Sequence, residues 1–114
     1  MFSQRNLPVK AEDDTSYYVA VEEMPEPIDG VSDIGAKLYY TDEALNAKIE
    51  GRIYIMAYVN EKGLVEKTRV LKGLGYGLDE VASDAVIKTK FSPGKQEGHP
   101  VKVQVAIPII FKLD

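Results

Sequence analysis

One alternating stretch near the C-terminus constrains the fold of this chain more than any other feature. From Val101 to Phe111, bulky apolar residues occupy every second position. This period of two predicts a long β-strand with one face in the core. Pro108 lies within the stretch, and a proline has no N–H to donate to a neighbouring strand. Because proline in a sheet is confined to edges, bulges and strand ends, the pattern predicts an edge strand.

The N-terminal part of this strand contains no proline, so its outward backbone groups are expected to be open for pairing. An exposed edge of this kind can accept an extended segment of a partner protein. The candidate partner-binding residues are Val101, Lys102, Val103, Gln104, Val105, Ala106 and Ile107. The alternative is an edge that pairs with nothing because Lys102 and Lys112 guard it.

Weaker patterns predict the other elements. They are a strand at 17–22, a helix at 41–49, hairpin strands at 52–59 and 64–71, a helix at 80–89, and loops around Gly30 and Gly35 and across 91–100. Thr41 and Asp79 are the expected helix caps, and imperfect alternation predicts a bulge or an early end in 64–71. The order indicates an α+β domain, with a small antiparallel three- to four-stranded sheet and two helices packed on one face.

The first 16 residues differ in character from the rest. Between Ser3 and Ser16 only Leu7, Val9 and Ala11 are apolar. Such a segment buries too little apolar surface to offset its ordering entropy. We therefore expect 1–16 to be a flexible tail or linker remnant, and 17–114 to be one domain.

The composition excludes several classes of protein. The 114 residues include no cysteine, which rules out disulfides, thiolate metal sites and a cysteine nucleophile. A net charge of −4 gives no electrostatic reason to bind nucleic acid. No apolar run approaches the roughly 20 residues of a membrane-spanning helix, and none follows Met1 as a signal peptide would require.

No group of residues forms a recognisable catalytic or cofactor site. Gly73 to Gly77 has the spacing G-x-G-x-G rather than that of a dinucleotide loop, so a structural turn is favoured. His99 lies in a polar loop with only Glu97 as a nearby partner. The acidic pairs Asp42-Glu43 and Asp79-Glu80 lie where helix starts favour negative charge. We therefore expect no enzyme activity, no cofactor and no metal site.

An ordered set of motifs extends from Ile49 to Leu113, over slightly more than half of the chain. The set is Ile49-Glu50-Gly51, Asn60-Glu61-Lys62-Gly63, Val70-Leu71-Lys72-Gly73-Leu74-Gly75-Tyr76-Gly77, Asp79-Glu80, Phe91-Ser92-Pro93-Gly94-Lys95 and Pro100-Val101 to Phe111-Lys112-Leu113. In this order the motifs resemble the C-terminal domain of the TonB energy transducers. Upstream, Glu22-Glu23-Met24-Pro25-Glu26-Pro27 and Tyr40 to Ala44 resemble the Bacteroidetes-type version. The likeness covers residues 17–113.

The resemblance implies a periplasmic module of a transport system. In that family the domain grips the TonB box, a short segment of an outer-membrane receptor, by strand addition onto its last strand. It transmits proton-motive force from inner-membrane motor proteins for nutrient uptake. The family's N-terminal inner-membrane anchor is missing from this sequence, which implies an excised domain or a soluble relative.

Two departures from the family and one alternative function remain open. Thr41 stands where the family usually has Pro, and Glu43 where some members carry Arg. The alternative is a structural or oligomerisation domain of another envelope protein that pairs through its edge strand. A weak or swapped homodimer is expected from the same open edge.

Overall fold

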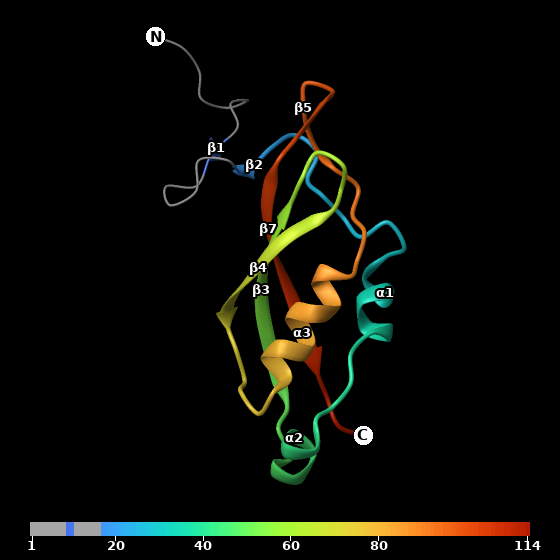
Figure 1. Cartoon of the computed structure of the whole chain (residues 1–114), viewed down its shortest axis with the longest axis vertical. Coiled ribbons are helices and arrows are strands. Elements are labelled where there is room, and N and C mark those ends of the chain that lie inside the picture. The colour runs from blue at the N-terminus through green and yellow to red at the C-terminus, as the bar shows by residue number, and fades with distance from the viewer. Residues whose placement is uncertain (1–8, 11–16) are drawn as a thin grey trace.

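The computed structural model describes residues 9–10 and 17–114 (Figure 1). Five strands form one sheet in the order β1-β2-β7-β3-β4. Their bounds are β1 Val9–Lys10, β2 Tyr18–Ala20, β3 Gly51–Val59, β4 Val65–Lys72 and β7 Val103–Phe111. The expected tail at 1–16 lies outside the described residues, apart from the two residues of β1, which pair with β2.

Strands β3 and β7 form the centre of the sheet. They pair antiparallel along nine residues each, from Gly51 opposite Phe111 to Val59 opposite Val103. On the other side of β3, β4 pairs with two register shifts, which confirms the bulge expected in this hairpin. On the other side of β7, β2 runs parallel, with Tyr18 opposite Val103. The sheet is therefore mixed and has five strands, where an antiparallel sheet of three to four was expected.

Helices cover one face of this sheet and bury the core. Helix α3 (Leu78–Ile87) lies across the sheet in Figure 1. Its buried residues pack with those of β3 and β7 in one cluster, which includes Leu78, Val81, Ala82, Ala85, Val86, Ile53, Ile55, Ala57, Val59, Ile107 and Ile109. Helices α1 (Val31–Ala36) and α2 (Asp42–Ala47) add Ile34 and Ala44 to the same cluster. The α+β class is confirmed, with three helices instead of two.

Two short elements occur where only loops were expected. Helix α1 lies between Gly30 and Lys37, contains Gly35, and has no side-chain cap. Strands β5 (Gly94–Gln96) and β6 (His99–Val101) form a separate hairpin. Its turn residues Glu97 and Gly98 have φ values of 53° and 78°. Neither element is long enough to give a clear periodicity in the sequence.

The expected capping role of Asp79 is wrong. Helix α3 begins at Leu78 with Gly77 as its N-cap residue. The Asp79 carboxylate instead accepts hydrogen bonds from the backbone N–H of Leu74 at 2.8 Å and of Gly75 at 3.3 Å. A side chain at Gly73 would overlap this carboxylate. The backbone of the glycine-rich link is therefore held by a carboxylate of the helix that follows it, which supports the interpretation as a structural turn.

Thr41 caps α2 as expected, and its loss is expected to destabilise the domain. The Thr41 hydroxyl accepts the N–H of Ala44 at 3.1 Å and donates to the carbonyl of Tyr76 at 2.6 Å. Thr41→Ala removes both bonds and should cost about 1 kcal/mol, which lowers the melting temperature by about 4–8 °C. Thr41→Ser keeps the hydroxyl and is the matched control. A melting temperature of Thr41→Ala equal to that of wild type would contradict the capping role.

Candidate functional site

The expectation that the last strand is an edge strand is wrong at its N-terminal end. Val101 belongs to β6 and lies opposite Gly94. The carbonyl of Lys102 accepts the N–H of Tyr18 at 2.8 Å, and Val103 lies opposite Tyr18. Three of the seven candidate residues therefore already have partners besides β3: Val101 lies in β6, and Lys102 and Val103 lie beside Tyr18 of β2.

Beyond this point the outer edge of β7 has no paired strand among residues 9–10 and 17–114. The remaining candidates, Gln104, Val105, Ala106 and Ile107, lie opposite Tyr58 to Ile55 of β3. Their backbone groups alternate between the two sides of the strand. The Lys102 carbonyl faces β2, so the N–H and C=O groups of Ala106 and Ile110 also face away from β3. Tyr18 lies opposite Val103 in a parallel pair and donates its N–H to Lys102, so its own carbonyl is placed to accept the N–H of Gln104. The unpaired groups begin at the Gln104 carbonyl, and we call the segment 104–110, seen from this side, the open edge.

Pro108 lies on this open edge with the parity of Lys102 and Ala106. The N–H that Pro108 lacks would point away from β3, toward the side where no described strand pairs with β7. The pairing of Pro108 with Tyr54 of β3 therefore loses no hydrogen-bond donor. A proline does mark a side of the strand that has no paired strand in the described part of the chain. The unpaired stretch, however, lies closer to the C-terminus of β7 than the sequence predicted. The sequence used Pro108 only as the marker of the edge, and the residue that it missed on this edge is Ile110.

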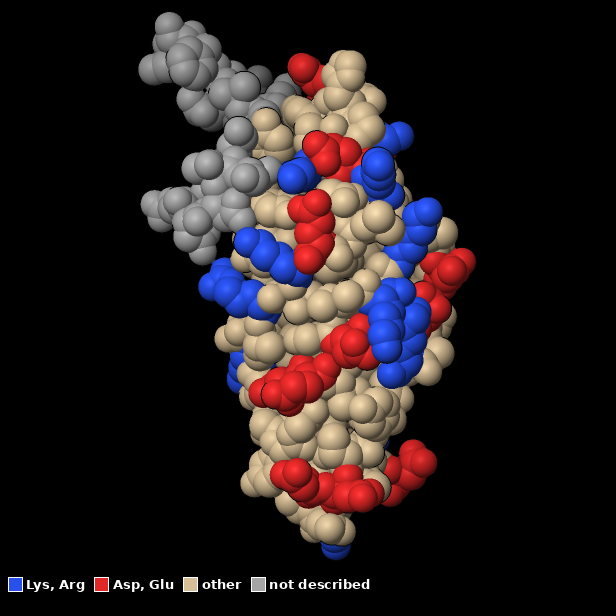
Figure 2. Space-filling view, viewed as in Figure 1, with Lys and Arg blue, Asp and Glu red and all other residues tan. Residues whose placement is uncertain are grey.

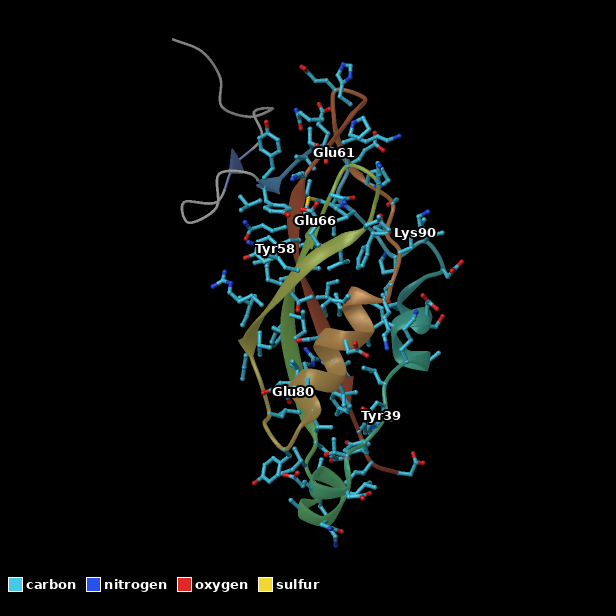
Figure 3. All side chains as sticks on the ribbon, viewed as in Figure 1. Tyr39, Tyr58, Glu61, Glu66, Glu80 and Lys90 are labelled. Atoms are coloured by element: carbon cyan, nitrogen blue, oxygen red, sulfur yellow. The ribbon has the colours of Figure 1, made fainter. Side chains whose placement is uncertain are left out.

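A groove with one apolar and one mixed half adjoins the C-terminal half of the open edge. It consists of two neighbouring hollows of about 260 and 270 Å³ between α1 and β7, which share Gly35, Leu38 and Ile110. The remaining lining residues are Val31, Ile34, Tyr39, Tyr40, Ile107, Pro108, Ile109, Phe111 and Lys112. Tyr39, labelled in Figure 3, is 65 % exposed. The spacing of Val31, Ile34 and Leu38 at i, i+3 and i+7 is the sequence signal for this helix face.

A cluster of aromatic and charged side chains lies at the N-terminal end of the open edge. The buried ring of Tyr17 packs edge-on against Tyr58, with centroids 5.0 Å apart. The Tyr17 hydroxyl donates to the carboxylate of Glu66, which lies near Tyr58 in Figure 3. Glu66 also accepts from the Asn60 amide at 3.3 Å and lies 3.6 Å from the Lys102 ammonium. This cluster anchors the start of β2 through side chains, because β2 and β7 share only one register pair.

The same cluster changes the acidity of Glu66. The hydrogen bond from Tyr17 is the largest cause, and the Asn60 amide and the Lys102 ammonium act in the same direction. Together they lower the pKa of the Glu66 carboxyl from its usual value despite the opposing effect of desolvation. Glu66 is therefore held as an anion that accepts hydrogen bonds, which suits an anchor and not a proton donor.

One polar group beside this cluster lacks a partner. The side chain of Gln104 is 5 % exposed, and within the described part of the chain its Nε2 has no hydrogen-bond partner. A buried donor without an acceptor is costly, so such groups are rare. Gln104 lies where β2 ends its pairing and the open edge begins.

The surface charges do not indicate a metal or nucleic-acid site. Figure 2 shows acidic and basic side chains interleaved over the visible face, with acidic ones at the end that carries α2. Among residues 9–10 and 17–114, no three His, Asp or Glu side chains are grouped so that they could hold a metal ion. In the same part of the chain no helix has the length and hydropathy of a membrane span. The side chain of His99 is exposed, although the residue begins strand β6 and does not lie in the loop that was expected.

The sequence of this chain was compared with known protein families. Residues 36–113 match the family described as Gram-negative bacterial TonB protein C-terminal. Because the match covers more than half of the chain, the protein belongs to the TonB C-terminal domain family. Domains of this family are of a periplasmic type and serve TonB-type transport. No curated protein matches the chain.

Proposed function

We propose that this chain is the peptide-binding module of a TonB-type energy transducer. It pairs the open edge of β7 with the TonB box of an outer-membrane receptor. The pairing passes force from inner-membrane, proton-driven motor proteins to the receptor for nutrient uptake. The observation that carries the proposal is the set of outward backbone groups between Gln104 and Ile110, next to the position that β2 already occupies as a parallel strand.

The free backbone groups account for a weak, reversible grip. Ala106 and Ile110 offer an N–H and a C=O each, and Pro108 adds a carbonyl without a donor. Each main-chain hydrogen bond to an added strand stabilises the complex by about 0.5–1.5 kcal/mol net. Ordering a flexible receptor segment offsets much of this sum. A force coupler that must release its receptor needs such a balance.

The other long edge of the sheet is a poorer site for an added strand. Strand β4 carries Lys67, Arg69 and Lys72, and its register shifts twice against β3. Charged side chains and bulges are the usual devices that protect an edge from pairing. The proposal therefore assigns the receptor to β7, at residues 104–110, and leaves β4 without this role.

Amide hydrogen exchange tests the proposal with single-residue resolution. Adding a peptide from the N-terminal segment of an outer-membrane receptor should protect the amides of Ala106 and Ile110. The amides of Val105, Ile107 and Ile109 face β3 and should change little, since they are protected already. A peptide of the same length with proline substituted at alternate positions is the control, because it cannot donate those hydrogen bonds.

Two outcomes would contradict this assignment. Protection confined to β4 or to the helices would place the peptide elsewhere. Protection of Ala106 and Ile110 that rises with protein concentration and needs no peptide would favour the oligomerisation domain. Light scattering at the same concentrations separates a second copy of this chain from a receptor peptide.

A further inference from the structure

Gly35 in α1 has no reason in the fold to be a glycine. Glycine in a helix interior is destabilising relative to alanine. Its φ is not positive, so any residue can adopt this backbone conformation. A side chain added here would meet no atom within 4 Å, in contrast to Gly63, Gly73 and Gly94, where it would overlap neighbouring atoms.

Gly35 lies on the helix face that borders the open edge. Val31 and Leu38 flank it at i−4 and i+3, so the three residues share one face. Gly35 lines both hollows of the groove, together with Leu38 of the same chain segment and Ile110 of β7. Val31 is 75 % exposed although it is apolar, and Ile110 borders the groove from β7. The absent side chain therefore leaves space between the exposed Val31 and β7.

We propose that Gly35 keeps this groove open for a bulky apolar side chain of the strand that pairs with β7. This inference rests on the proposed function and adds the chemistry of the peptide. In a sheet, residues opposite each other on neighbouring strands point to the same face. Peptide residues opposite Ile107 and Ile109 therefore point toward the helices, into the space under α1.

The chemistry of the groove selects an extended apolar segment as its occupant. The hollow beside Pro108 is lined by Val31, Ile34, Leu38 and the isoleucines of β7, which offer no charged group. The outward backbone groups of Ala106 and Ile110 can be satisfied by an extended strand, as Lys102 is satisfied by Tyr18. The residue of the peptide opposite Pro108 points to the other face and is unrestricted. The preferred segment therefore has large apolar residues two positions apart.

A groove-filling substitution tests this inference. Gly35→Leu should place a side chain in the groove, and the matched control Ser32→Leu adds the same side chain to an exposed position of α1 that does not line it. The probes are two extended peptides of about eight residues, in which Thr alternates with Ile or with Ala. Calorimetry should show that Gly35→Leu binds the Ile peptide about tenfold or more weakly than wild type and Ser32→Leu do.

The Ala peptide completes a double-mutant cycle of protein variant against peptide side chain. A substitution that only perturbed the protein structure would weaken the binding of both peptides equally. The Ala peptide should bind wild type weakly and should lose little further affinity in Gly35→Leu, because it has no side chain that needs the groove. The melting temperature of Gly35→Leu should not fall below that of wild type. Gly35→Ala, whose added Cβ meets nothing, replaces it if the larger substitution prevents folding, and it should weaken binding of the Ile peptide less.

The outcomes separate this inference from the proposed function. If neither the Ile peptide nor a receptor peptide binds wild type, the proposed function fails. If the Ile peptide protects Ala106 and Ile110 but binds Gly35→Leu as tightly as wild type, the function stands and the groove inference is overturned. A wild-type dimer that Gly35→Leu dissociates, with no peptide binding, would make a second copy of the chain the occupant and would also overturn it.

Discussion

Phe91→Ala is expected to destabilise the domain by about 3–5 kcal/mol, the largest effect of any single truncation considered for this chain. The side chain of Phe91 is 1 % exposed and is among the largest fully buried side chains. It belongs to the same cluster as α3 and the central strands, although it follows α3 in a loop. Truncation leaves a cavity in this cluster, and rigid surroundings cannot close it.

The backbone around Phe91 explains why the cavity would not collapse. Its N–H donates to the carbonyl of Gly63 at 2.9 Å, and the residue forms a bridge with Pro27. Urea denaturation measures the expected loss, with Ile87→Ala as the control because Ile87 is 47 % exposed. A loss for Phe91→Ala no larger than that for Ile87→Ala would show that the loop can repack.

Gly63→Ala is expected to destabilise the domain by about 3 kcal/mol, for two separable reasons. Gly63 has a φ of +82°, which side chains rarely adopt. A Cβ at this position would also overlap the backbone carbonyl oxygen of Phe91, which cannot rotate away as a side chain can. The turn after Asn60 must therefore shift away from residue 91, and the hydrogen bond between the two segments lengthens.

Gly75→Ala isolates the first of these reasons. Gly75 has a φ of +76° but open space around the added Cβ, so its substitution should cost about 1 kcal/mol only. Thermal unfolding of the two variants gives the comparison, at about 4–8 °C per kcal/mol for a domain of this size. Equal melting temperatures for Gly63→Ala and Gly75→Ala would mean that backbone conformation alone governs both turns.

The sequence predicts the long elements of this fold because each carries a repeated pattern. Val103 to Phe111 and Gly51 to Val59 alternate over enough residues to fix which face is buried. The buried stripe of α3, from Val81 to Val86, repeats at helical spacing. The short elements carry no such signal. A six-residue helix that contains Gly35 and a hairpin of three-residue strands are stabilised by tertiary contacts, which a local pattern does not record.

The sequence predicted the kind of candidate site, an unpaired strand edge, but not the part of β7 in which that edge lies. Pro108 indicates that one side of the strand makes no hydrogen bond from an N–H at this position. In the structure Pro108 faces the same side as Lys102, away from β3. The sequence could not show that Tyr18 returns to pair at Val103, because a single parallel register pair leaves no periodic trace. It also could not show the groove, since Gly35 and Ile110 are 75 residues apart in the chain and meet only through the fold.

The order of the strands has a consequence for folding kinetics. The C-terminal strand β7 is central, and among residues 9–10 and 17–114 its only long partner, β3, lies about 50 residues earlier in the chain. A chain synthesised from its N-terminus therefore leaves one edge of β3 unpaired until the last residues are available. Closing so large a loop is slow relative to local hairpin or helix formation. We therefore expect the sheet to form late, after β7 is available, and a truncated product that lacks β7 to be more open to proteolysis than the whole domain.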